Sequence, residues 1–364
     1  MGLLLVSMAD FSGRMNDIES IVAAKKPSPG LESFRFASAP RRFSGAVAPN
    51  TMTRMRLPSS RSPIVLPSPL QRRLETRIED FFRAGAGPDM DFSSPPGEAA
   101  LSAPDSVSWR IFKNPLSLFI GGVTAVILEL AEPRVREGVW RHTRFRDDAL
   151  QRMQRTGLAA MMTVYGPRSR TEAMIERVCR MHACISGTTP DGRPYRADDP
   201  ELLSWVHATA SFGFLKAYHV YVHSLDHAER NRFYEESATS SRIYGALDAP
   251  TSEQELHRLF LSMRDTLEAS PVVFEFLEIV RKVALLPRPL AFVQDWLVRA
   301  AVELVPLAIR ERLALAGEPK LQAWQHAFIR RCGEAIDRIP LKTSPAVQAC
   351  RRIGLPEDYL YTRW

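Results

Sequence analysis

The chain has 364 residues, of which 45% are hydrophobic and 24% charged, an ordinary composition for a globular protein. Residues 1–75 carry 11 basic and 5 acidic side chains, whereas the rest of the chain carries 37 basic and 36 acidic ones. The part expected to fold therefore lacks the basic excess that phosphate binding needs, and we exclude nucleic acid as a partner.

The composition of the first hundred residues predicts an unfolded extension followed by a short helix. Twelve of the 27 prolines lie between residues 27 and 104, and residues 33–73 include no acidic side chain. Such a segment cannot bury enough apolar surface to offset the entropy lost on ordering, which predicts a disordered Arg/Ser/Pro-rich tail over 1–73. Apolar residues then predict a short docking helix and a linker within 74–105.

The spacing of apolar residues from residue 106 onward predicts an all-α domain. Residues 116–130 are mostly apolar, but the run is too short for a transmembrane span and contains Gly121, Gly122, Thr124 and Glu129, so we expect a buried helix there and no span elsewhere. One loop, 187–195, has strand character. We expect the domain to cover 106–345 and a C-terminal tail to cover 346–364. Apolar residues at three- and four-residue steps predict further helices over 147–162, 171–185, 201–224, 253–269, 272–285, 290–304 and 321–339.

Three histidines, His219, His223 and His227, recur at every fourth position at the end of the helix predicted over 201–224. An adjacent pair at this spacing can chelate one metal ion. All three cannot share an ion, because the first and last are about 12 Å apart along a helix. Charged neighbours favour a solvated helix end over a zinc site.

Two other histidines, His182 and His207, are each flanked by apolar residues at helical spacing. A histidine in this setting is most often a core residue with satisfied hydrogen bonds. The same setting also suits a haem ligand, because a neutral imidazole must project from a rigid helix into an apolar slot. The local sequence leaves both interpretations open.

One helix face gathers two cations and a hydroxyl, since Arg152, Arg155 and Thr156 stand at i, i+3 and i+4. Such a face can bind a propionate or another anion, although spacing alone favours a solvated basic face. The sequence has no Walker loop, no GxGxxG after a strand and no GxSxG, so it gives no nucleotide-binding or hydrolase signature.

The order of four segments resembles the rubber-oxygenase/mpaB-type catalytic domain family, which includes latex-clearing proteins and a fungal ER-bound oxygenase. The resemblance covers roughly residues 110–320. The matching segments are Glu132-Pro133 with residues 135–146, Arg152-Met153-Gln154-Arg155-Thr156, Val178-Cys179-Arg180-Met181-His182 with Gly187, and residues 195–207, which end in Trp205-Val206-His207.

The resemblance implies a b-type haem in a globin-related all-α core, with the iron held by one histidine. By its place in the motif that histidine is His182, and His207 would lie beside the haem. Arg152 and Thr156 match the Arg and Thr that the latex-clearing enzymes place near the haem, and Arg152 or Arg155 would neutralise a propionate.

The chain departs from the family pattern at Glu132-Pro133, where many members have His-Pro. A carboxylate at this position can act as a catalytic acid or base beside dioxygen. It can equally form an ion pair with a nearby arginine, and both alternatives stay open.

The sequence thus predicts a haem b-dependent oxygenase that acts with dioxygen on a small apolar substrate, isoprenoid or lipid-like. The alternative is a non-catalytic helical haem- or lipid-binding protein of the same fold, and a third is a His-rich zinc protein. The apolar start at residues 2–6 is interrupted by Asp10 and has no basic segment before it. We therefore expect a cytoplasmic protein. The sequence does not indicate an oligomeric state.

Overall fold

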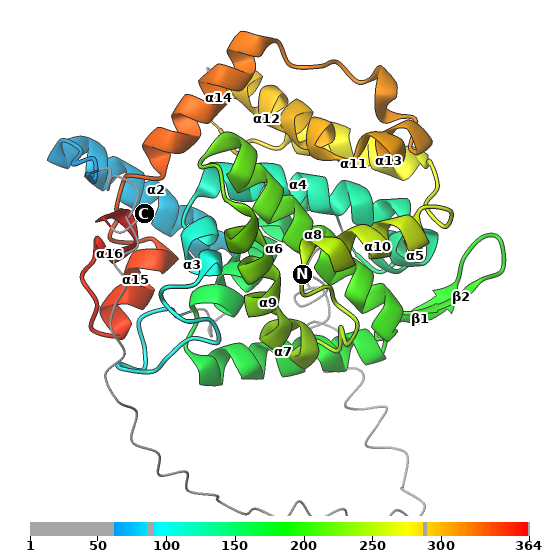
Figure 1. Ribbon diagram of the computed structural model, residues 1–364, viewed down its shortest axis with the longest axis horizontal. Coiled ribbons are helices and arrows are strands. Elements are labelled where there is room, and N and C mark those ends of the chain that lie inside the picture. The colour runs from blue at the N-terminus through cyan, green and yellow to red at the C-terminus, as the bar shows by residue number, and fades with distance from the viewer. Residues whose placement is uncertain (1–61, 86–90, 144, 287–289, 363–364) are drawn as a thin grey trace, which may run out of the picture.

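The fold comes from a computed structural model (Figure 1), which describes residues 62–85, 91–143, 145–286 and 290–362, and of residues 81–85 the backbone only. Helices make up 66% of the structure, with one short hairpin as the strand content of the described part. This confirms the all-α expectation. The tail predicted for residues 1–61 lies outside the described residues.

Two helices, α4 (Pro115–Ala131) and α8 (Pro200–Tyr221), form the centre of the molecule and pack against each other along their length (Figure 1). The side chain of Asn114 caps α4 by accepting the N–H of Ser117 at 3.1 Å. Because α4 is apolar on nearly all sides, other helices must surround it. The buried helix expected over 116–130 is therefore present.

The chain bends sharply where α4 ends and α5 (Pro133–Arg141) begins, because Glu132 caps α5 and Pro133 occupies its first turn. In the described residues no single helix is long and apolar enough to cross a membrane. Only α4 and α5 taken together would pass by length and composition, and they are bent by 109°.

The remaining helices form two groups around this centre. Below and beside it in Figure 1 lie α3, α6, α7 and α9, and above it lie α11 to α14. The bounds of the first group are Val107–Phe112 for α3, Ala149–Tyr165 for α6, Arg168–Ala183 for α7 and His227–Ile243 for α9. The second group comprises Pro271–Lys282 for α11, Ala291–Leu304 for α12, Leu307–Arg312 for α13, the 3-10 turn Leu315–Gly317 and Ala323–Ile336 for α14. Helix α10 (Glu253–Met263) packs against α8 and α9.

A hairpin of β1 (Ser186–Thr188) and β2 (Pro194–Arg196) projects from the right of the molecule in Figure 1. The strands are antiparallel, and Gly187 stands opposite Tyr195. A Cβ atom at Gly187 would lie 2.6 Å from the Tyr195 hydroxyl, so a larger residue there would have to displace the buried Tyr195 ring. The hairpin occupies the loop for which the sequence indicated strand character.

The expectation of one helix carrying His219, His223 and His227 is wrong. Helix α8 ends at Tyr221, and α9 begins at His227. A capping box stops any continuation, because Asp226 accepts the N–H of Glu229 at 2.8 Å while Glu229 accepts the N–H of Asp226 at 2.9 Å.

The described segments before and after the domain expected over 106–345 form helices and hydrogen bonds. Helix α2 (Ser68–Gly85) begins before the residue 74 that the sequence suggested. The segment expected as a tail from residue 346 instead forms two helices in its described part, α15 (Pro345–Arg352) and α16 (Tyr359–Thr362), joined by residues 353–358. The buried Arg352 donates to the carbonyls of Phe92 at 2.7 Å and Glu98 at 2.8 Å, which joins the two flanks.

Candidate functional site

His207 on α8 is buried, and one of its ring nitrogens lacks a hydrogen-bond partner among the described residues. His207 is 5% exposed, and its Nε2 atom has no partner among the described residues. Burial lowers the pKa of His207 to about 3, so its imidazole is neutral at neutral pH. A neutral imidazole with an unsatisfied buried nitrogen is costly in a folded protein unless a ligand or water reaches it.

The histidine of α7 lies in the last turn of that helix and is 2% exposed. Its surroundings include Asp198, just before α8. The pKa of Asp198 is lowered chiefly by a hydrogen bond from Arg196, and also by the charge of His182. His182 therefore lies where the end of α7 meets the start of α8, which Asp199 caps through the N–H groups of Glu201 and Leu202.

On α6, Arg152 is buried, whereas Arg155 and Thr156 are half-buried. The Thr156 hydroxyl donates to the Arg152 carbonyl at 3.0 Å, and Arg155 donates to the Gln151 side chain. The solvated basic face that spacing alone favoured is therefore wrong for Arg152.

Two helix faces meet at the segment that follows α9. On the face of α6 that carries Arg152 and Thr156, Thr163 lies 3.0 Å from the Tyr244 hydroxyl. From α8, Ser204 accepts the N–H of Asp248 at 3.2 Å, one turn before His207. Residues 244–248 thus contact both α6, through Thr163, and α8, through Ser204.

Glu132 is fully buried at the joint between α4 and α5. One carboxylate oxygen accepts the N–H of Val135 at 2.8 Å, and the other pairs with Arg134 at 2.8 Å. Arg134 reaches on to Glu201 in the first turn of α8, at 3.2 Å. The ion pair that the sequence left as one alternative is present, and the role as acid or base stays a prediction.

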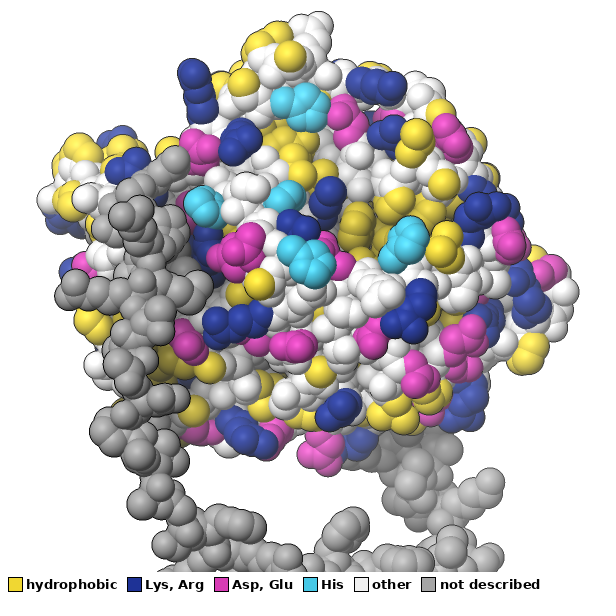
Figure 2. All heavy atoms as spheres, in the orientation of Figure 1, with side chains coloured by type: hydrophobic (Ala, Val, Ile, Leu, Met, Phe, Trp, Pro, Cys, Tyr) yellow, Lys and Arg dark blue, Asp and Glu magenta, His cyan; other side chains and the backbone are white. Residues whose placement is uncertain are grey.

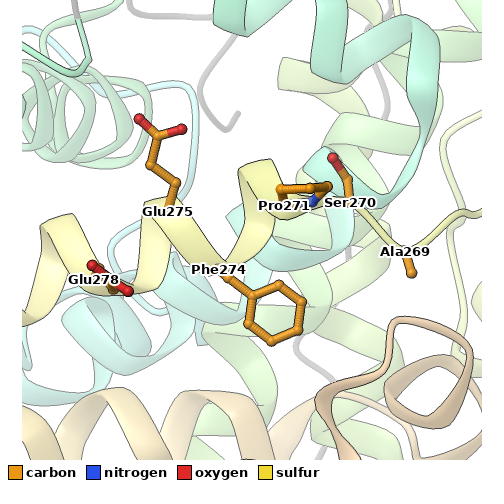
Figure 3. Close-up of a pocket in the computed structure, with 6 residues that line it drawn as sticks. All are labelled: Ala269, Ser270, Pro271, Phe274, Glu275 and Glu278. Atoms are coloured by element: carbon orange, nitrogen blue, oxygen red, sulfur yellow. The ribbon is translucent and has the colours of Figure 1, made fainter.

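Sequence reasoning missed two features. Glu129 is fully buried in α4, one turn before Glu132, although the sequence placed it in an apolar run. The second feature is a depression of about 570 Å³ at the start of α11, lined by Phe274, Glu275 and Glu278 among others (Figure 3). These two carboxylates already pair with Arg146 and Lys282, and none of the predicted site residues lines the depression.

In the described part of the chain, no group of three or more His, Cys, Asp or Glu side chains is arranged to hold a metal ion. His219 accepts the N–H of Leu225 at 3.0 Å, and His227 lies on the next helix. The geometry that a zinc site on one helix would need is not formed.

The profile of the family described as "ER-bound oxygenase mpaB/B'/Rubber oxygenase, catalytic domain" matches residues 109–335, more than half of the chain. The chain belongs to this family. Searches of curated proteins and of solved structures found no significant match.

The mpaB/rubber oxygenase domain begins within α3 and ends within α14. It includes all the candidate site residues from Glu132 to His207, and the resemblance inferred from their order is confirmed. The chain therefore carries a catalytic domain of an oxygenase family, whereas α2, α15 and α16 lie outside the matched region.

Proposed function

We propose that the protein is an oxygenase that binds haem b and acts with dioxygen on a small apolar substrate. Membership of an oxygenase family supports the reaction class. The observation that carries the haem is the buried Nε2 atom of His207, which lacks a partner among the described residues. Such an atom is explained when a ligand occupies the space beside it.

The donor set fits a haem. Neutral imidazole is the form of histidine that binds iron, and His207 is neutral because burial depresses its pKa. His182 is also buried, at the junction of α7 and α8. A buried Arg152 supplies the positive charge that a propionate requires within a low-dielectric interior.

The residues take separate roles in this proposal. His182 holds the iron, as its motif position implies, and Arg152 with Arg155 binds the propionates. His207 places Nε2 beside the bound group, where it can accept or donate a hydrogen bond, and its burial keeps water away from that atom. Haem, when bound, supplies the redox chemistry with dioxygen.

One observation favours the alternative of a non-catalytic haem- or lipid-binding protein. Both carboxylate oxygens of Glu132 are engaged, by the α5 cap and by Arg134, which favours a structural role for this carboxylate over proton transfer. Consumption of dioxygen with prenyl or fatty-acyl substrates separates the two functions, because both proteins would bind haem.

The test is an absorption spectrum with iron analysis of protein purified from haem-replete cells. We expect a Soret band and about one iron per chain. His182→Ala should lose the haem, and His207→Ala should keep it but lower turnover. His257→Ala, an exposed position on α10, is the matched control. If only His207→Ala loses the haem, His207 is the iron ligand and His182 is the residue beside the haem. Colourless wild-type protein would overturn the proposal.

A further inference from the structure

Helices α12 and α14 lie side by side and expose aromatic rings to solvent. The ring centroid of Trp296 is 5.0 Å from those of Phe292 and Trp324, and 5.9 Å from that of Phe328. We call these four residues the aromatic patch. Three of them stay largely exposed: Phe292 at 52%, Trp324 at 56% and Phe328 at 42%. Exposed rings in one contiguous cluster mark an interaction surface rather than a core.

The sequence spacing shows that this surface is built by two helices. Phe292 and Trp296 are one turn apart on α12, and Trp324 and Phe328 are one turn apart on α14. Figure 2 shows hydrophobic side chains at the upper end of the molecule, where α14 begins in Figure 1. The aromatic patch thus lies at an extremity, where a broad flat partner can reach it.

The charged side chains near the aromatic patch that lack an ion-pair partner in the described part of the chain are positive. Its acidic neighbours are already paired: Asp295 with Arg281 and Arg299, and Glu334 with Arg330. Arg331 lies two turns along the Trp324 face of α14, and Lys320 precedes that helix. Both are exposed, and neither has an acidic partner in the described part of the chain.

Further positive charge lies beyond the end of α14. Helix α2 is held there, because Glu75 accepts the N–H of Lys342 at 3.0 Å. It exposes Arg72, Arg73 and Arg77, none of which forms an ion pair with a described acidic residue.

We propose that the aromatic patch docks the protein onto a membrane surface that contains anionic lipids. Tryptophan and phenylalanine rings are suited to the boundary between headgroups and acyl chains, and neighbouring Arg and Lys attract anionic headgroups. A second copy of the chain is disfavoured as the occupant, because patch-to-patch contact would bring Arg331 and Lys320 against their own copies. Docking does not depend on haem. A failure to bind vesicles would therefore leave the proposed haem-binding function untouched, and a failure to bind haem would leave the docking proposal untouched.

The test is co-sedimentation of the full chain with vesicles of phosphatidylcholine alone or with phosphatidylserine added. We expect binding only to the anionic vesicles, and weaker binding at high salt. The double variant Trp324→Ala/Phe328→Ala should lose binding, whereas Leu247→Ala/Leu261→Ala, which truncates two exposed leucines elsewhere, should not. Arg331→Glu should bind about tenfold more weakly, and Arg258→Glu on α10 should bind as wild type.

Tryptophan emission gives a second readout that a folding defect does not imitate. Trp324→Phe should keep vesicle binding but lose most of the blue shift that lipid contact causes. Circular dichroism melts check that each variant is folded. Absence of vesicle binding by the wild-type chain, or wild-type binding by the folded double variant, would overturn the proposal. So would a concentration-dependent dimer that forms through the aromatic patch in place of lipid binding.

Discussion

Gly121 of α4 and Gly213 of α8 lie against each other so closely that neither position has room for a methyl group. A Cβ atom at Gly121 would lie 2.6 Å from the Gly213 carbonyl oxygen, and a Cβ atom at Gly213 would meet the carbonyl oxygen of Gly121. The obstacle on each side is backbone, which cannot rotate away. This contact sets the distance between the two central helices.

Replacement of Gly213 by alanine should therefore separate α4 from α8. We expect the free energy of unfolding to fall by about 3 kcal/mol, the upper range for an overpacked core. The neighbouring Gly122→Ala is the control, because its nearest atom outside the helix, on the Phe214 ring, would be 3.9 Å away. Urea unfolding of both variants measures the difference, and equal stabilities would contradict the packing described for Gly213.

The neutral state of His207 predicts a loss of stability in acid for the haem-free protein. Its pKa is about 3 in the folded chain, against about 6.5 when unfolded, so the unfolded state binds the extra proton between these values. Stability is complete above pH 6.5 and falls as the pH drops towards 3. At pH 5 this group alone should cost about 2 kcal/mol. His207→Gln should flatten the dependence between pH 7 and 5, and an unchanged slope would show that His207 is not buried in this way.

The cap formed by Glu132 predicts a structural cost on its removal. Glu132→Ala should lower the free energy of unfolding by about 2 kcal/mol, since α5 loses its cap and Arg134 loses its buried partner. Glu201→Ala removes the exposed partner of the same arginine and should cost about 0.5 kcal/mol or less. Thermal unfolding of the two variants measures this difference in stability. A Glu132→Ala variant as stable as wild type but devoid of oxygenase activity would instead favour the acid or base role.

The four cysteines predict a graded reaction with thiol reagents. Cys184 is exposed, whereas Cys350 is buried and burial raises its pKa to about 12. At pH 8 about one in ten thousand Cys350 thiols would be ionised, so it should react only after unfolding. Titration with Ellman's reagent should show a fast phase that Cys184→Ser removes and Cys350→Ser leaves unchanged. A fast phase that survives Cys184→Ser would contradict this order.

Local signals predicted much of the fold. The Asp199-Pro200 start of α8 follows from capping rules, and the apolar run before Glu132 predicted the central α4. The apolar pattern predicts an end at residue 224, and the histidine spacing suggests a face that continues to His227, whereas α8 ends at Tyr221. The Asp226/Glu229 capping box was the signal that marked the true boundary.

The candidate site was predictable in its residue types and less so in its contacts. The i, i+4 spacing placed Arg152 and Thr156 on one face of α6. It could not show that Arg152 is buried, or that His207 lacks a partner for Nε2 among the described residues, because both follow from tertiary packing. The order of motifs, rather than any one of them, identified the family.

The bonds from Arg352 to the segment around Phe92 have a consequence for how the chain is made. The two residues are 260 positions apart in sequence, and Arg352 also accepts the N–H of Gly97 at 2.7 Å. A ribosome therefore finishes nearly all of the domain before this early segment has a partner to bind. Until then its backbone groups stay solvated, and nascent chains stalled before α15 should offer this segment to chaperones and proteases.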